Sequence, residues 1–254
     1  MGEYLEEAIS SIYLYKNKED FEIILVNDGS TDVFTNQIIE KIGKDNSEIL
    51  ILNQQNLGLA KARNNGIKLA KAAIIIPLDA DNKLRPEFIE QAIQIFETND
   101  KIGVLHGDAQ FFGEKDTIWI GKKFVFSDMI QNNYIDACAA FRKSIWQNLN
   151  GYDQNMPEMG FEDWDLWLRI ANQGYEFEYC PTVFFDYRVR KNSMLSSAWL
   201  KRNDLINYMF AKPELKHLLD YRNCLLENKV LKREPSTKSI LKILLKKIKR
   251  KLFQ

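Results

Sequence analysis

Short apolar runs alternate with helix-type patterns over about the first hundred residues of this chain. Three runs predict buried strands, because they are nearly continuous in apolar residues: 21–26, 48–53 and 73–78. Apolar residues at helical spacing predict four helices: 5–14, 34–42, 59–72 and 86–98. Such alternation predicts an α/β fold with a mostly parallel sheet and helices on both faces. Ligands of such sheets bind at the carboxyl ends of the strands.

Composition and residue usage exclude several classes of protein. The 254 residues are 45% apolar and 28% charged, which is enough apolar material for a sizeable core. Residues 1–237 hold 28 basic and 35 acidic residues, and a body with a net charge of −7 argues against nucleic-acid binding. Three dispersed cysteines and two histidines argue against a disulfide scaffold and a zinc cluster. The sequence has no G-x-G-x-x-G, Walker A or G-x-S-x-G motif, which argues against dehydrogenases, P-loop ATPases and α/β-hydrolases.

Two carboxylates follow the third predicted strand as Asp79-Ala80-Asp81. At a spacing of two along an extended chain, both side chains point to the same side. Such a pair can share a divalent cation, and carboxylate oxygens suit Mg²⁺ or Mn²⁺. An isolated D-x-D is more often a solvated turn, but its position after a buried strand favours the metal site.

The turn after the first predicted strand reads Asn27-Asp28-Gly29, followed by Ser-Thr-Asp at 30–32. Gly29 permits a positive φ, and one of residues 30–32 is expected to cap the next helix. Asp28 stands at the carboxyl end of the strand, where its carboxylate is placed to accept hydrogen bonds from a ligand base. Both roles of this turn can hold together.

Four motifs occur in one order along the chain: VNDGSTD at 26–32, N-x-G-L-A-K-A-R-N-N-G at 56–66, LDAD at 78–81 and GFEDWDLWLR at 160–169. Together they resemble the family 2 glycosyltransferases, a large inverting family. The resemblance covers roughly residues 3–200. It implies the GT-A fold, a Rossmann-like α/β/α sandwich, here with C-terminal helices added.

The resemblance assigns the nucleotide-sugar site to four of these residues. Asp28 matches the acid that recognises the base of the nucleotide, for which a UDP-sugar is the leading candidate. Arg63 lies in the segment that lines the nucleotide-sugar pocket, where a guanidinium can meet a phosphate or a sugar hydroxyl. Asp79 and Asp81 match the D-x-D, whose second acid holds the metal that bridges the diphosphate. The implied cofactor is Mn²⁺ or Mg²⁺.

The resemblance also implies the catalytic base and two weaker sites. Glu162-Asp163 matches the acidic pair that supplies the base, which we assign to Asp163, with Glu162 as second choice. Trp164 is a candidate for stacking on an acceptor sugar, with core packing as the alternative. Arg188 and Arg190 lie where relatives often have a mobile loop that closes over the diphosphate.

Inverting transfer requires groups of these types. An acceptor hydroxyl attacks the anomeric carbon from one face while the nucleoside diphosphate leaves from the other, through an oxocarbenium-like transition state. A carboxylate within hydrogen-bond reach takes the proton of the hydroxyl and typically contributes about 10²–10⁴-fold to the rate. A bound cation neutralises the charge that develops on the leaving group.

One departure from the family pattern bears on activity. Relatives begin with an apolar strand ending in P-x-Y-N, just before the segment that matches residues 3–5, and this strand is missing here. The strand is central in the family's sheet, so its loss leaves backbone groups of both neighbours unpaired. We therefore expect either that the chain begins before Met1 or that it is a truncated product.

The C-terminal region predicts two further segments beyond the glycosyltransferase domain at 1–200. Residues 201–234 predict a helical extension that packs under the domain. Residues 235–254 predict a hinge and a basic amphipathic helix, with six apolar residues on one side of the helical wheel and Lys or Arg opposite. Such a helix is typical of binding to an anionic membrane surface, with docking on the body of the protein as the alternative. With no apolar run long enough to span a bilayer, we expect a cytoplasmic protein, peripheral on the inner face of the cell membrane.

Three functions remain open from the sequence. The leading one is metal-dependent, inverting transfer from a nucleotide sugar to a glycan or lipid-linked acceptor. The second is a non-catalytic remnant of such an enzyme, which the missing strand motivates. The third is a sugar-phosphate nucleotidyltransferase, although the Gly-rich N-terminal loop usual in those enzymes is not seen.

Overall fold

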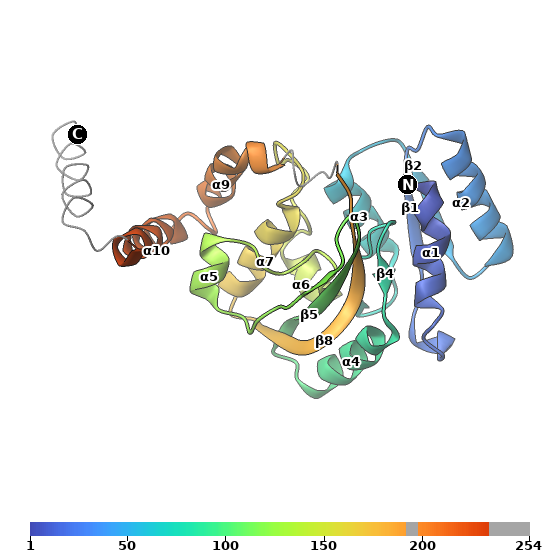
Figure 1. Cartoon of the computed structure of the whole chain (residues 1–254), viewed down its shortest axis with the longest axis horizontal. Helices are drawn as coiled ribbons and strands as arrows, with labels where there is room; N and C mark the ends of the chain where they lie inside the picture. Colours follow the sequence, from blue (N-terminus) through green and yellow to red (C-terminus); the bar gives the residue numbers. More distant parts are fainter. Residues whose placement is uncertain (192–197, 234–254) are drawn as a thin grey trace.

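A computed structural model describes residues 1–191 and 198–233, which form two β-sheets surrounded by helices (Figure 1). The predicted hinge and basic helix at 235–254 lie outside the described residues. Within the described part of the chain, no helix is both long enough and apolar enough to cross a bilayer.

The N-terminal part is a small parallel sheet covered by two helices. Strand β1 (Ile24–Asp28) pairs in parallel with β2 (Leu50–Gln54), in register from Ile24 opposite Leu50 to Asp28 opposite Gln54. Helices α1 (Gly2–Ile12) and α2 (Val33–Asp45) pack against one another. The core of this part consists of five buried aliphatic residues: Leu5, Ile9, Ile39, Ile42 and Ile49. A 3₁₀ turn, Lys18–Asp20, connects α1 to β1.

The turn after β1 forms as the sequence predicts. Gly29 has a φ of +73°, and a Cβ there would lie 2.4 Å from the backbone nitrogen of Asn56. Asp32 is the N-cap of α2, since its carboxylate accepts the backbone N–H of Thr35 at 2.8 Å.

The larger sheet has the strand order β3-β7-β5-β8-β4, with β6 paired to β5. Its strands are β3 (Ile74–Ile75), β4 (Lys83–Leu84), β5 (Ile102–Gly113), β6 (Thr117–Trp119), β7 (Ala140–Arg142) and β8 (Glu176–Val189). Only β5 and β8 run parallel, whereas the other four pairings are antiparallel. The sheet is therefore mixed rather than mostly parallel, because β7 lies antiparallel to both of its neighbours, β3 and β5.

Helices cover both faces of the larger sheet, which gives the predicted α/β/α arrangement (Figure 1). Neighbouring residues of β5 point to opposite faces of the sheet. Leu105 packs against α4 (Pro86–Thr98) on one face, whereas Val104 belongs to a second core on the other face. Six helices contribute to that second core: α3 (Leu59–Leu69), α5 (Phe126–Gln131), α6 (Lys143–Asn148), α7 (Glu162–Asn172), α9 (Arg202–Ala211) and α10 (Leu218–Arg233). The predicted C-terminal extension thus packs on the body, as two helices interrupted near Pro213.

The two sheets are not joined by a strand. In the described residues β1 pairs only with β2, and β3 only with β7. The predicted strand 73–78 is only two residues long as β3, since only Ile74 and Ile75 have ladder partners.

Candidate active site

Arg63 brings two of the sequence motifs together. It projects from α3 and forms ion pairs with Asp79 Oδ1 at 2.7 Å and with Glu162 Oε1 at 2.8 Å. The guanidinium is largely buried, with 11% of the side chain exposed, and Glu162 is 4% exposed. Burial opposes the charge on Arg63, but the two carboxylates outweigh it and raise its pKa. The pairs join residues 16 and 99 positions apart, so the fold brings residues of three sequence motifs into contact.

The Asp79-Ala80-Asp81 segment forms the turn between β3 and β4, closed by a bond from Asn82 N–H to the Asp79 carbonyl. The Asp79 side chain is 43% exposed, whereas that of Asp81 is only 10% exposed. The pKa of Asp81 is raised by burial and by the like charge of Asp79, while Arg190 opposes the shift. Two neighbouring carboxylates of which one is buried are a suitable, partly assembled binding place for a divalent cation.

The donor set fits a cation that a substrate helps to hold. The described residues contain no group of three or more His, Cys, Asp or Glu arranged to hold a metal. Mg²⁺ and ions like it are commonly bound by one or two carboxylates together with substrate phosphates. Asp79 and Asp81 supply two carboxylates, which matches that pattern. One oxygen of each is paired with an arginine, Oδ1 of Asp79 with Arg63 and Oδ2 of Asp81 with Arg190.

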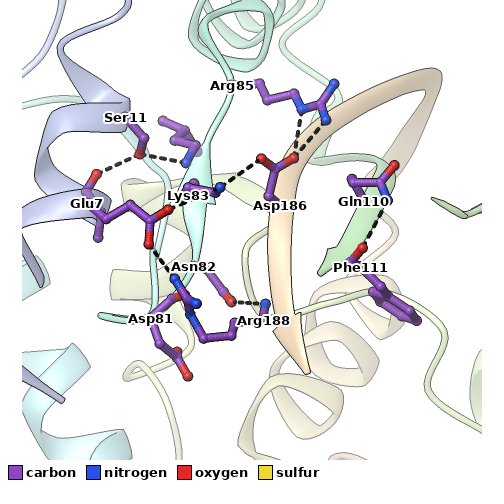
Figure 2. Close-up of polar contacts among 12 residues, drawn as sticks. Glu7, Ser11, Asp81, Asn82, Lys83, Arg85, Gln110, Phe111, Asp186 and Arg188 are labelled. Carbon is purple, nitrogen blue, oxygen red and sulfur yellow. Dashed lines mark hydrogen bonds and ion pairs between the residues drawn. The ribbon is translucent and has the colours of Figure 1, made fainter. Parts of the chain in front are cut away.

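Arg188 and Arg190 both contact Asp81, and Figure 2 shows Arg188 beside it. Arg188 Nε donates to the Asp81 carbonyl at 3.0 Å, and its guanidinium also pairs with Glu7 of α1. Arg190 Nε lies 2.9 Å from Asp81 Oδ2. Arg188 is a residue of β8, paired opposite Phe112 of β5, so the expectation that it belongs to a mobile loop is wrong. Its ladder bonds fix its backbone, and a role toward the diphosphate stays a prediction.

Glu162 and Asp163 open α7, where the helix dipole favours negative side chains. Asp163 Oδ1 accepts the N–H of Trp164 at 2.7 Å, and Oδ2 accepts Asn133 Nδ2 at 2.9 Å. Burial raises the pKa of Asp163 well above its ordinary value, and the charges of Glu162 and Asp136 raise it further. A carboxylate of raised pKa is a stronger proton acceptor than an exposed one, which suits a general base.

Asp136 belongs to the same cluster and was not predicted from the sequence. It lies between α5 and β7, where its carboxylate accepts the N–H of Cys138 at 2.9 Å. Burial raises its pKa to about 6, and Asp79 and Glu162 add to the shift. No recognisable motif surrounds Asp136, and the one signal in the sequence is a single acid in an otherwise apolar stretch.

Asp28 is engaged by the loop that leads into α3. Its Oδ1 accepts Gln54 Nε2 at 2.7 Å and the N–H of Leu57 at 2.8 Å, while Oδ2 accepts the N–H of Gly58 at 2.9 Å. An ionised carboxylate has about four acceptor positions, so about one remains for a ligand. The structural and base-recognition roles are therefore compatible, and the second stays a prediction.

Trp164 is part of the core. The residue is 2% exposed, and its Nε1 donates to the Met129 carbonyl at 2.7 Å. It therefore cannot stack on an acceptor sugar as the sequence suggested, because its ring packs against Phe161. Trp199, which is 53% exposed, stands on the same Phe161 with the ring centroids 6.1 Å apart.

An α/β/α fold with an acidic pair after β3 and a second acidic pair at the start of α7 is typical of the GT-A fold class. The sequence profile of Glycosyl transferase family 2 matches residues 2–169, so this chain belongs to that family.

Curated relatives agree with the family assignment. The chain is 30% identical over 209 residues to an uncharacterized glycosyltransferase of Haemophilus influenzae, covering 76% of this chain and 64% of that protein. It is 30% identical over 240 residues to WfaP of Escherichia coli, a UDP-Glc:α-D-GlcNAc-diphosphoundecaprenol β-1,3-glucosyltransferase, covering 86% and 90%. The chain therefore spans less than two thirds of the first relative and most of the second.

Solved structures share the fold. Staphylococcus aureus TarS 1–349 in complex with UDP-GlcNAc aligns with a TM-score of 0.66 at 18% identity, over 89% of this chain and 68% of that one. The mannosyltransferase PcManGT of Pyrobaculum calidifontis, in complex with GDP-Man and Mn²⁺, aligns with a TM-score of 0.65 at 18% identity, over 89% and 66%.

Proposed function

We propose that this chain transfers a sugar, with inversion, from a nucleoside-diphosphate sugar to a hydroxyl group of a glycan or lipid-linked acceptor. The observation that carries the proposal is the bridge from Asp79 through Arg63 to Glu162. The bridge supports the proposal because Asp79 of the D-x-D and Glu162, the neighbour of Asp163 in sequence, contact the same guanidinium. A donor with a diphosphate at one end and a reactive anomeric carbon at the other requires such a pair of neighbouring acidic groups.

The residues have distinct roles in this reaction. Asp28 binds the nucleotide base, and Arg63 holds the donor pocket together. Asp79 and Asp81 hold Mn²⁺ or Mg²⁺, which when bound neutralises charge on the diphosphate. Arg188 and Arg190 balance the charge around Asp81. Asp163 takes the proton of the attacking hydroxyl.

The relatives support a uridine nucleotide and a lipid-linked acceptor for this chain. WfaP uses UDP-Glc and a diphosphoundecaprenol-linked sugar, and TarS is seen with UDP-GlcNAc. A lipid-linked acceptor would place this chain at the inner face of a membrane, with its basic segment 238–254 on the anionic surface.

The experiment compares binding with chemistry in the whole chain. UDP-glucose and UDP-GlcNAc are supplied with Mn²⁺, and UDP release is followed with water alone and with a GlcNAc-diphosphate-lipid acceptor. We expect Asp163→Asn to bind UDP within a few-fold of the parent while release falls by at least about 10²-fold, because an amide cannot take the proton. Asp81→Ala should abolish the Mn²⁺-dependent part of UDP binding. Asp100→Asn, at a fully exposed position, is the matched control.

Each alternative function gives a different result. Loss of release in Glu162→Gln with near-normal release in Asp163→Asn would assign the base to Glu162. UDP binding without turnover of any donor would identify a non-catalytic member of the family. Pyrophosphate formed from UTP and a sugar 1-phosphate would identify a nucleotidyltransferase.

A further inference from the structure

Asn133 contacts the carboxylate that we propose as the base. It lies between α5 and β7, half-buried, 30 positions from Asp163 in sequence. Its Nδ2 donates to Asp163 Oδ2 at 2.9 Å, and its Oδ1 accepts the N–H of Ile135 at 3.1 Å. The side chain therefore connects the segment between α5 and β7 to the first turn of α7.

The two contacts fix which way the amide points. The backbone N–H of Ile135 can only donate, so the atom that faces it must be the amide oxygen. The NH₂ group then necessarily faces Asp163. A flipped amide would set NH₂ against an N–H and an oxygen against a carboxylate, and both contacts would be repulsive. The donor–acceptor assignment thus follows from the backbone.

The Asp163 carboxylate is held by one N–H at each oxygen. Trp164 N–H binds Oδ1 and Asn133 binds Oδ2, which leaves about one acceptor position on each oxygen for a substrate hydroxyl. Without Asn133, Oδ2 loses its hydrogen bond, and the plane of the carboxylate can turn about the Cβ–Cγ bond. The α7 N–H alone fixes one oxygen but not the plane of the group.

We propose that Asn133 is a positioning residue of the transfer reaction, which aims the Asp163 carboxylate at the acceptor hydroxyl. The inference rests on the proposed function, because it takes Asp163 as the base. Asn133 itself touches no reacting atom in this scheme and acts only through Asp163.

The surroundings of Asp163 give the contact a second effect. Four titratable or charged groups interact electrostatically with the Asp163 carboxylate: Glu162, Asp136, Arg63 and Tyr152. The two acids favour the protonated carboxyl, and Arg63 favours the ionised form. A hydrogen bond donated by Asn133 also favours the ionised form, which is the form that accepts a proton.

The first test measures kinetics in three variants of the full chain. In Asn133→Leu, UDP release should fall about 10–100-fold in kcat with KM for the UDP-sugar nearly unchanged. The acid limb of the kcat/KM profile should move up by about one pH unit, because the donor that favours the carboxylate is gone. Asn133→Ser serves as a second variant in case the leucine variant folds poorly. A serine hydroxyl can still accept the Ile135 N–H but is too short to reach Asp163, so we expect the same fall in kcat and the same shift of the pH profile. Asn132→Ala is the control, since Asn132 is exposed and contacts Arg202 instead.

The second test needs no activity. With ¹³C-labelled aspartate, the Asp163 carboxyl signal is assigned from its loss in Asp163→Asn and titrated in the parent and in the Asn133 variants. An upward displacement of its pKa in Asn133→Leu and Asn133→Ser, together with the kinetic change, supports the proposal. An unmoved titration and an unmoved pH profile in a folded variant overturn it. If Asp163→Asn turns over normally, the proposed base is wrong, and the positioning role is overturned even where the titration moves.

Discussion

Asp136 stands out at the scale of single residues because no cation pairs with it among the described residues. Asp79 and Glu162 both add negative charge around it, and the one nearby cation, Arg63, is already paired with those two acids. The only hydrogen bond that its carboxylate accepts in the described structure comes from the Cys138 N–H. Burial of such a carboxylate opposes folding unless the group is protonated.

Replacement of this carboxylate should therefore stabilise the protein at alkaline pH. The folded-state pKa of Asp136 is about 6 and its ordinary value is 3.8, so between these values the folded state holds a proton that the unfolded state has lost. Stability due to this group is lost as pH rises from about 4 to 6. We expect Asp136→Asn to gain about 1–3 kcal/mol at pH 8 and nothing at pH 4, measured by urea unfolding without divalent cations. Equal gains at both pH values would contradict the argument, and Asp100→Asn serves as the control.

The sequence predicts the members of the site that stand in motifs better than the residues that contact them. Arg63, Asp79 and Glu162 stand in motifs, because their chemistry requires fixed residue types at fixed positions. Asn133 and Asp136 stand in no motif and reach the site only through the path of the chain between α5 and β7. Nothing short of the tertiary fold reveals such residues.

Among the secondary-structure elements, α7 is anchored through its first turn. This turn bears Glu162, Asp163 and the fully buried Asp165. Lys212, just after α9, lies 2.5 Å from Asp165 Oδ1 and 2.6 Å from Asp153 Oδ2. The C-terminal helices therefore anchor the helix that presents the candidate base.

Loss of this anchor should destabilise the protein far more than loss of a surface pair. Lys212→Met leaves the buried Asp165 with Arg169 as its remaining ion-pair partner and should cost about 3 kcal/mol. The matched control is Lys201→Met, whose pair with Glu158 is 57% and 29% exposed and should contribute less than about 1 kcal/mol. Denaturant midpoints of both variants measure the difference. Similar costs would show that the Lys212 pair contributes no more than a surface contact.

The four helices of the first hundred residues were predictable from the sequence, whereas the long strands were not. The predicted helix 86–98 coincides with α4, because Pro86 and the apolar spacing mark it clearly. In contrast, β5 and β8 carry no simple alternation, since β5 is buried on both faces along most of its length. Their pairing also contains register shifts between Ile102 and Ala109, which break any period of two.

On the scale of the whole molecule, each sheet has a core of its own, and Ile24 of β1 and Ile12 of α1 pack against the cores of the larger sheet. The β1–β2 sheet packs on α1 and α2, and in the described structure no ladder connects it to the six-stranded sheet. All five tryptophans lie between Trp119 and Trp199, so their fluorescence reports only on the larger part. Units joined without a shared ladder are expected to open separately.

Unfolding should therefore occur in two steps. We expect amides of β1 and β2 to exchange with solvent at lower urea concentrations than those of β5 and β8. The far-UV CD transition should begin before the tryptophan fluorescence transition, because it includes α1 and α2. Hydrogen exchange by mass spectrometry resolves the two sheets. Coincident transitions and uniform protection would instead indicate a single cooperative unit.

The Arg63 bridge also limits how this sequence can change over evolutionary time. A lineage that lost Arg63 alone would retain an almost fully buried Glu162 carboxylate without its guanidinium. A lineage that lost Glu162 alone would leave a buried guanidinium with only the half-exposed Asp79 as partner. Either single step is unfavourable, whereas joint replacement by neutral side chains removes both charges. We therefore expect Arg63 and Glu162 to be retained together or replaced together in related sequences, although their codons lie far apart.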